Sequence, residues 1–389
     1  MTIKKKKTLS SIVVAAFAAT FFLCSCSKQQ NISTVDIENL EGSSSEKVTL
    51  IGEDSKMVVD ADVLVPSKAE YGVYTASYSN YEPQLVKSIL LGDVEAKLNE
   101  YPSEKNGIIE TSYIWNYENT ELYFFDSTPM IMLTSDLYNF INCVFSPPYM
   151  SSEGNAEMFE SCELSFCTGD EAVEAVLEIL NELGINVADN PDVYSLSQSD
   201  LQSVVNLYTE NNIFYDYQLE YIPDTVDSSH ECYYIKFNAA YNGIPLYNQY
   251  LSYKTITDFT MSNPEINAIY SADGLKYLCV TFYRGDVQEI DEVTRLISAE
   301  AAAQTALNKY KDVVTASEIN FDAIELMYVY TPLNGETKLN EKGSVKMSPA
   351  WVCSGTIVST KQDKFGGEDQ LVTEKVTVLI DAMTGMEII

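Results

Sequence analysis

Apolar and polar residues alternate along several short stretches of the chain, the pattern of strands that bury one face. The clearest stretch runs from Met57 to Val65, and Pro66 ends it. A second begins at Tyr71 and reaches Thr75. The pattern predicts further strands over Tyr113–Trp115, Leu122–Phe125, Met130–Leu133, Phe214–Tyr221, Cys232–Phe237, Leu275–Phe282, Ile324–Tyr330, Met347–Val352, Val376–Ile380 and Met386–Ile389.

Other stretches repeat their apolar residues with helical spacing. The clearest helix begins at Thr168, whose side chain can cap the first turn while Glu171 reaches back to it, and Gly184 provides the stop. Ser298 can cap a second, alanine-rich segment in the same way. The helices predicted from this spacing are Pro83–Leu98, Thr168–Gly184, Asp200–Leu207 and Ala299–Lys309.

These elements predict an α+β fold in which antiparallel sheets are each packed by one or two helices. A chain of 389 residues is typical of two or three domains. We therefore expect two or more domains behind a signal peptide and a flexible tether. The expected segments are a signal peptide over 1–25, a tether over 26–47, a β-rich α+β domain over 48–165, a middle helix-plus-sheet unit over 166–290 and a C-terminal α+β module over 291–389.

The N-terminal segment has the order of a bacterial export signal. Four lysines, Lys4 to Lys7, precede an apolar run from Ile12 to Leu23 that is short for a membrane span. The run ends in Leu23-Cys24-Ser25-Cys26, which resembles the lipobox of bacterial lipoproteins. The alternative, an uncleaved membrane anchor, is disfavoured because the polar residues 27–30 follow directly. The resemblance implies lipidation at Cys26, for example by palmitate, and a location on the outer face of the cytoplasmic membrane.

Charge excludes one class of partner. The formal net charge is −33, and it becomes −37 when the first 25 residues, with four lysines and no acids, are removed. Such a chain repels nucleic acid, and only two arginines, Arg284 and Arg295, oppose the acids. The acidity favours a solvated, aggregation-resistant surface. The alternative is a docking face for a cationic partner or for divalent ions.

The six cysteines beyond the lipobox permit three disulfides. Their spacings are irregular and most lie in strand-like runs, so we expect buried thiols. Cys162 and Cys167, five residues apart, would face opposite sides of one continuous strand and could not pair. The six are Cys143, Cys162, Cys167, Cys232, Cys279 and Cys353.

The motifs of catalysis and of cofactor binding are absent from the sequence. No phosphate-cradling loop, dinucleotide fingerprint or nucleophile elbow occurs, and we expect neither a cofactor nor a metal. A catalytic triad would need the single histidine, His230, which we expect in a surface loop. Asp60 and Asp62 lack the glycine turn and distal glutamate of a calcium loop, so an exposed strand face is expected.

The last hundred residues resemble a known envelope module. They contain the helix opened at Ser298, the Pro349-Ala350-Trp351 strand start and the turn Asp381-Ala382-Met383-Thr384-Gly385. In these features they are similar to the PepSY-like modules of Gram-positive envelope proteins, including YycI-type regulators of a cell-wall histidine kinase. The resemblance implies that Trp351 anchors the helix on the sheet and that Asp381 and Gly385 form a tight turn. Residues 168–246 resemble a diverged copy of this unit.

Three classes of function remain open from the sequence. The whole chain resembles clostridial surface lipoproteins, which implies a non-catalytic interaction or regulatory protein with an envelope protein as partner. The second class is a saccharide- or peptide-binding lipoprotein that uses some of the 27 tyrosines. Clusters near Tyr71 and Tyr233 could form such a site, although tyrosines of sheet cores explain most of them. The third class is a glycoside hydrolase with a carboxylate pair.

Overall fold

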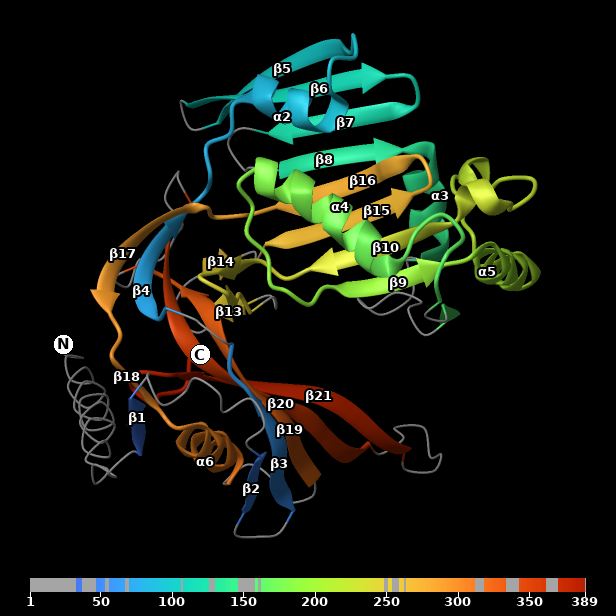
Figure 1. Cartoon of the computed structure of the whole chain (residues 1–389). Helices are drawn as coiled ribbons and strands as arrows, with labels where there is room; N and C mark the ends of the chain where they lie inside the picture. Colours follow the sequence, from blue (N-terminus) through green and yellow to red (C-terminus); the bar gives the residue numbers. More distant parts are fainter. Residues whose placement is uncertain are drawn as a thin grey trace, which may run out of the picture.

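The chain folds into two lobes, each built around a mostly antiparallel sheet (Figure 1). The computed structural model describes residues 33–36, 47–52, 56–66, 70–105, 108–125, 130–145, 158–159, 162–247, 251–253, 259–261, 264–311, 318–333, 343–361 and 370–388. The expected α+β class is confirmed. The expected lipobox and the rest of the expected signal peptide lie outside the described residues.

The first lobe contains an eight-stranded, wholly antiparallel sheet with the order β5-β6-β7-β8-β16-β15-β10-β9. We call it the eight-stranded lobe. Its strands are β5 Lys97–Lys105, β6 Ile108–Tyr117, β7 Thr120–Phe125, β8 Met130–Ser135, β9 Asp192–Leu196, β10 Cys232–Phe237, β15 Glu265–Ser271 and β16 Gly274–Thr281.

Helices cover both faces of this sheet. α2 (Pro83–Leu91) and α4 (Gly169–Glu182) lie on one face, and α3 (Asp136–Phe145) and α5 (Gln198–Glu210) lie on the other (Figure 1). The strands supply both interfaces because successive side chains alternate: on β16, Leu278 belongs to the first core and Cys279 to the second. The sheet is therefore a central layer between two helical layers.

The second lobe, the seven-stranded lobe, combines strands from both ends of the chain. Its order is β17-β4-β20-β19-β3-β2, and β21 pairs with the far part of β20. β19 runs parallel to β3, and helix α6 (Ala299–Tyr310) packs on one face. The strands are β2 Lys47–Ile51, β3 Met57–Leu64, β4 Gly72–Ser77, β17 Asp286–Glu292, β19 Glu318–Thr331, β20 Val345–Lys361 and β21 Gln370–Asp381.

Small elements complete the described structure. Three two-stranded pairs occur, β1 with β18, β11 with β12 and β13 with β14, along with two short 3-10 helices. Their bounds are β1 Thr34–Asp36, β18 Arg295–Ile297, β11 Ala240–Tyr241, β12 Ile244–Pro245, β13 Leu251–Tyr253, β14 Phe259–Met261, η3 Leu219–Tyr221 and η4 Ser228–His230.

Two consecutive residues join the lobes where β16 leads into β17. The Tyr283 hydroxyl accepts a hydrogen bond from the backbone N–H of Asn186 in the eight-stranded lobe (2.9 Å). Arg284 turns into the seven-stranded lobe, where its Nε donates to the Gly343 carbonyl at 2.9 Å and its guanidinium lies over the ring of Tyr78 at 4.7 Å. Arg284 is only 2% exposed. This pair is a clip that fixes the two lobes to each other.

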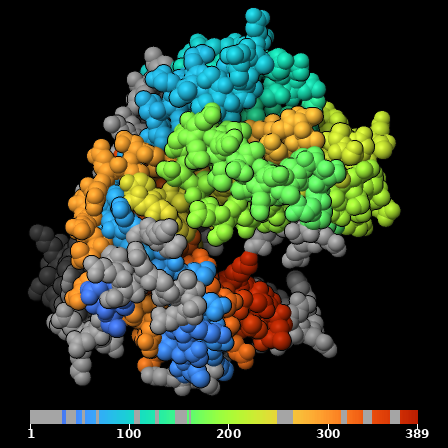
Figure 2. All heavy atoms as spheres, in the orientation of Figure 1, coloured from blue at the N-terminus to red at the C-terminus, as the bar shows by residue number. Residues whose placement is uncertain are grey.

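The sheets do not follow the expected segment boundaries at residues 165 and 290. The expected segment 48–165 contributes β2, β3 and β4 to the seven-stranded lobe but β5 to β8 to the eight-stranded lobe. The reason is non-local pairing: β3 bonds to β19, and β8 bonds to β16. Figure 2 shows the result, with middle residues (cyan to yellow) mostly in one lobe and residues near the two ends (blue and red) in the other.

Part of the expected flexible tether is ordered. Residues 34–36 form β1 and pair with Arg295–Ile297, and the Ser298 backbone N–H donates to the Ser33 carbonyl at 3.0 Å. Arg295 also forms an ion pair with Asp36 at 2.6 Å. The tether prediction is therefore wrong for these residues, because their backbone groups find partners in β18.

Three predicted elements differ from the structure. The helix expected over 83–98 ends at Leu91, because Gly92 takes a positive φ of 63° and β5 begins at Lys97. Residues 214–221 form turns and η3 where a strand was expected, and the helix α3 was not predicted at all. In place of the closing strand 386–389, a single bridge joins Glu387 to Ile380.

Two local features expected of residues 291–389 are present, the burial of Trp351 and the turn at 381–385. Trp351 is fully buried, and its core includes three alanines of α6, Ala302, Ala303 and Ala306. The Asp381 carboxylate accepts hydrogen bonds from the backbone N–H groups of residues 383 and 384, and Gly385 has a φ of 74°. The helix α6 also contacts β2 and β3, so its packing surface includes strands from the first part of the chain.

The six cysteines fall in three settings. Cys232, Cys279 and Cys353 are buried on strands, as expected, and Cys143 is buried on α3. Cys162 is exposed and Cys167 half-buried, in a bent segment before α4. That segment is not a continuous strand, so the reason given against their pairing does not apply, but no disulfide joins these two cysteines in the structure.

Candidate functional site

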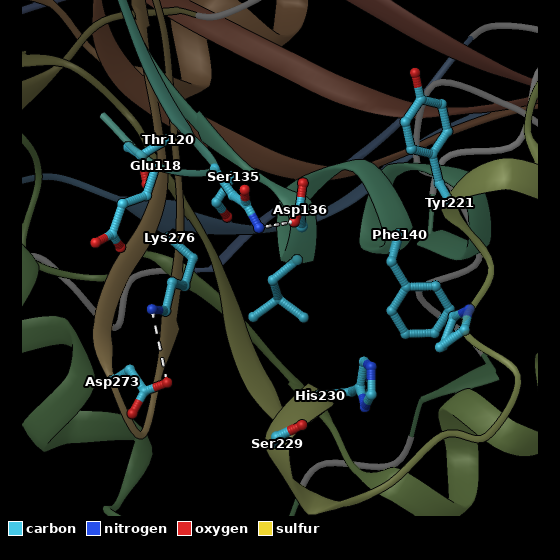
Figure 3. A pocket seen from close by; sticks show the side chains of 13 residues that line it. Glu118, Thr120, Ser135, Asp136, Phe140, Tyr221, Ser229, His230, Asp273 and Lys276 are labelled. Atoms are coloured by element: carbon cyan, nitrogen blue, oxygen red, sulfur yellow. Dashed lines mark hydrogen bonds and ion pairs between the residues drawn. The ribbon is translucent and has the colours of Figure 1, made fainter. Parts of the chain in front are cut away.

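A cleft of about 710 Å³ lies at one end of the eight-stranded lobe. Its walls come from the β6–β7 turn, the start of α3, the β15–β16 turn and the segment that carries η3 and η4. These parts lie far apart in the sequence and meet because β7, β8 and β16 are neighbours in the sheet. Figure 3 shows two walls that face each other, one polar and one largely apolar.

The polar wall begins at the first turn of α3. The Ser135 hydroxyl accepts a hydrogen bond from the Tyr138 backbone N–H at 3.3 Å, which caps the helix. Asp136, in the first turn, interacts favourably with the helix dipole and accepts a hydrogen bond from the Asn119 side-chain amide at 2.5 Å. Both contacts hold the Asp136 carboxylate at the mouth of the cleft.

Glu118, Asp273 and Lys276 complete this wall (Figure 3). Glu118 is exposed in the β6–β7 turn with a φ of 49°, a conformation that non-glycine residues rarely adopt. The Lys276 ammonium lies 3.7 Å from the Asp273 carboxylate, whose side chain is 83% exposed. The pair is weak at that distance, because one partner is largely in solvent, so the Asp273 carboxylate remains accessible to a ligand.

The opposite wall is formed by Leu137, Phe140, Tyr221, Pro223 and His230. The rings of Phe140 and His230 pack edge to face, with an angle of 83° between their planes and their centroids 5.4 Å apart. Phe140 is almost fully buried, whereas Tyr221 is 40% exposed. A hydrogen bond to Glu220 raises the pKa of the Tyr221 hydroxyl. Tyr221 is thus the accessible aromatic ring of the cleft.

His230 is held at the rim by a small network centred on Asp227. Its Nδ1 lies 3.0 Å from the Asp227 carboxylate and 3.2 Å from the Asp227 backbone nitrogen. The Ser229 hydroxyl donates to the same carboxylate at 2.6 Å, and this bond is the main reason why the pKa of Asp227 is lowered. Serine, histidine and aspartate therefore meet here, with the carboxylate at the centre.

That order of bonds does not activate a nucleophile. In a catalytic triad the serine donates to one imidazole nitrogen while the carboxylate binds the other. Here Ser229 is bonded to Asp227 and not to His230. The arrangement stabilises a one-turn helix, whose cap is Asp227. The structure thus places His230 in a surface segment, as the sequence predicted, and also beside a cleft, which it did not.

The acidic residues considered as metal ligands do not form a metal site in the described part of the structure. Asp60 forms an ion pair with Lys47 at 3.0 Å on an exposed strand face, as expected, and that face carries a hollow of about 430 Å³. Within the described ranges, no group of three or more His, Cys, Asp or Glu side chains is arranged to hold a metal ion.

The tyrosine clusters belong mainly to cores and to the junction of the lobes. Tyr74, Tyr241 and Tyr328 pack edge to face, with ring centroids 4.7 to 6.3 Å apart. The Tyr233 hydroxyl donates to the Cys167 carbonyl and accepts from the Leu164 N–H. The alternative of saccharide binding needs a tyrosine-lined cleft, and Tyr221 is the single tyrosine in the lining of this cleft.

Sequence reasoning missed the residues of the cleft other than His230. They are Glu118, Asn119, Thr120, Ser135, Asp136, Leu137, Phe140, Tyr221, Pro223, Ser229, Asp273 and Lys276. Two local signals pointed toward them: a polar turn between two strands at 118–119 and the Ser135–Asp136 start of an amphipathic helix. Neither signal indicates that the turns lie side by side.

Comparisons with known proteins support the fold. No protein-family model matches the chain, and no curated protein matches it. The crystal structure of an uncharacterized protein from Eubacterium rectale ATCC 33656 is similar, with a TM-score of 0.62 and 16% sequence identity. The similarity covers 91% of this chain and 99% of that one. Among the described residues, no helix is long and apolar enough to cross a membrane.

Proposed function

We propose that this chain is a lipid-anchored, extracytoplasmic interaction protein of a Gram-positive envelope that binds a partner and does not catalyse a reaction. The observation that carries the proposal is the chemistry of the cleft. It brings accessible polar groups opposite an apolar wall, as binding sites do, and its serine, aspartate and histidine are bonded in an order that leaves no activated nucleophile.

The carboxylates of the cleft also favour binding over glycoside hydrolysis. A glycosidase needs one carboxyl group that stays protonated near neutral pH, which burial usually provides. Glu118, Asp136 and Asp273 are all exposed, and Asp136 sits at a helix N-terminus with an amide donor. None of the three is buried, so the described lining of the cleft lacks the buried carboxyl group that a general acid needs.

The position of the anchor fits this role. The lipobox cysteine, Cys26, precedes the first described residue, Ser33, by seven positions. A fully extended chain of that length spans roughly 25 Å. Because β1 is paired with β18, an acylated Cys26 would keep the seven-stranded lobe near the membrane. The cleft belongs to the other lobe, where a partner in the envelope can reach it.

The packing of α6 supports the proposed PepSY-like character of the C-terminal region. α6 lies across β20 and β21 with Trp351 buried in the same core as its alanines. In the eight-stranded lobe, α4 likewise contacts β10 and β15. A regulatory role through an envelope protein partner, as in YycI-type proteins, is part of this proposal.

Capture experiments in the host test the proposal. The wild-type lipoprotein, the double variant Asp136→Asn/Tyr221→Ala and the control Glu178→Gln, on the exposed side of α4, would be cross-linked in intact cells and purified. We expect an envelope protein to be recovered with the wild type and the control, and to be lost with the cleft variant. Recovery that is independent of the cleft variant, or no recovery, would refute the binding role. In the same cells, Cys26→Ala should abolish labelling by radioactive palmitate.

A further inference from the structure

The charge of the cleft is uneven. Three exposed carboxylates, Glu118, Asp136 and Asp273, line it together with one ammonium group, Lys276. These four groups together carry a formal net charge of −2. The neighbour that binds Asp136 is a neutral amide, so the interaction does not offset its charge. A cationic ligand would therefore gain electrostatic energy on entering, and an anionic ligand would lose it.

The apolar wall provides a second attraction for a cation. An aromatic face attracts an ammonium or guanidinium group within about 6 Å of its centroid. Tyr221 is accessible for such a contact and stands across the cleft from the carboxylates (Figure 3). The chain already uses this interaction internally: Arg284 lies 4.7 and 4.9 Å from the rings of Tyr78 and Tyr330, and Lys236 lies 5.3 Å from the ring of Tyr194.

The acidic charge of the whole chain reinforces the preference of the cleft for a cationic ligand. With 57 acidic and 24 basic residues it attracts cations over a distance and repels anionic polymers. A neutral saccharide gains nothing from this field. It would also rely on stacking, and the cleft offers only one well-exposed ring among its described lining residues. Its volume of about 710 Å³ exceeds that of one side chain and leaves room for flanking backbone.

We infer that the cleft accepts a basic segment of a partner protein, with an arginine or lysine side chain placed between Tyr221 and the carboxylates of Glu118 and Asp136. This inference rests on the proposed binding role and specifies the chemistry of the ligand. Lys276 limits the affinity, because its charge repels the incoming cation and competes for Asp273. Electrostatic complementarity of this kind mainly accelerates association and selects the partner.

Fluorescence anisotropy with two labelled peptides tests the inference. The probes are a tetra-arginine peptide and its tetra-citrulline counterpart, which has nearly the same shape without charge, and unlabelled chitotetraose serves as a neutral competitor. The full chain would be titrated in dilute buffer and in 0.5 M NaCl, where the Debye length falls to about 4 Å. We expect the arginine peptide to bind at least tenfold more tightly than the citrulline peptide, and the difference to shrink in salt.

Variants of the acidic and aromatic residues and the variant of Lys276 should change the affinity for the arginine peptide in opposite directions. Asp136→Asn, Glu118→Gln and Tyr221→Ala should each weaken binding of the arginine peptide about two- to fivefold. Lys276→Gln should strengthen it by a similar factor, which damage to the fold would not do. The matched control Glu178→Gln removes one acid from the far side of the sheet and should leave binding unchanged.

Each other outcome overturns the inference. Equal binding of both peptides, or none, excludes a cation site, and equal weakening by Glu178→Gln and Asp136→Asn would show a diffuse charge effect. If the citrulline peptide or chitotetraose binds and Tyr221→Ala abolishes that binding, the cleft remains a binding site with a different ligand. In that case the proposed function stands while the cationic ligand is refuted.

Discussion

Replacement of Trp351 by alanine should remove a large part of the stability of the seven-stranded lobe. Trp351 lies on β20 between Leu326 of β19 and Ile380 of β21 and is fully buried. Its indole Nε1 donates a hydrogen bond to the Ile297 carbonyl at 3.0 Å, which connects β20 to β18. The small alanines of α6 leave the space that the indole fills.

Two losses add up in Trp351→Ala. Truncation of a buried tryptophan costs about 3–5 kcal/mol, because the surroundings cannot close the cavity. The Ile297 carbonyl also loses its partner in a dry interior, which costs a further ~1 kcal/mol or more. Trp351→Phe keeps most of the volume and loses the hydrogen bond, so about 1–3 kcal/mol is expected. Natural domains have only about 5–15 kcal/mol of stability in all.

Urea unfolding followed by far-UV circular dichroism measures these costs. Tryptophan fluorescence can also follow the unfolding of each lobe separately, since Trp115 is buried in the eight-stranded lobe and Trp351 in the seven-stranded lobe. In the Trp351 variants, Trp115 fluorescence reports unfolding of the eight-stranded lobe alone. In Trp115→Phe, Trp351 fluorescence reports unfolding of the seven-stranded lobe alone. The midpoint should fall most for Trp351→Ala at an unchanged m-value. A loss below about 1 kcal/mol, or one no greater than that of Trp351→Phe, would refute the packing argument.

Three further predictions concern single groups. Arg284→Lys should lower the free energy of unfolding by about 2–3 kcal/mol, because an ammonium cannot make the two hydrogen bonds of the guanidinium group. The same change at exposed Arg295 should lower it by less than about 1 kcal/mol, and equal losses in urea unfolding would contradict the clip. Gly385→Val should cost at least ~1 kcal/mol, since valine is strained at a φ of 74°, and a neutral effect would rule out that turn. Iodoacetamide at pH 8 should modify exposed Cys162 first and Cys353 only on unfolding, because burial raises the pKa of the Cys353 thiol to about 12. Mass spectrometry of the folded protein after increasing times checks this order. Cysteines that stay unreactive after denaturation would indicate disulfides.

The elements that the sequence predicted well carry their signals locally. The helix α4 has both hydrogen bonds of its capping box, between Thr168 and Glu171, and Ser298 caps α6 as expected. Strand β3 alternates buried and exposed residues along its length. Caps and alternation act over a few residues, so a single sequence is enough to detect them.

The missed elements depended on contacts that the sequence does not display. Residues 214–221 are rich in tyrosine and resemble a strand, yet they make no ladder and fold into turns. The three residues of β1 lie in the expected tether, and the sequence does not display the pairing with β18 that orders them. The cleft depends in the same way on the pairing of β8 with β16, which brings Asp136 near Asp273 across more than a hundred residues of sequence.

The parallel pairing of β3 with β19 sets the order in which the chain can fold. β3 ends at Leu64, and its partner begins at Glu318, about 250 residues later. During synthesis or export, the edges of β3 and β4 that pair with later strands therefore remain unpaired until the residues of the eight-stranded lobe have emerged. Contacts of such sequence separation slow folding and leave aggregation-prone edges exposed. An N-terminal fragment produced without the last hundred residues should consequently need a chaperone to stay soluble, although its eight-stranded sheet would be complete by Thr281.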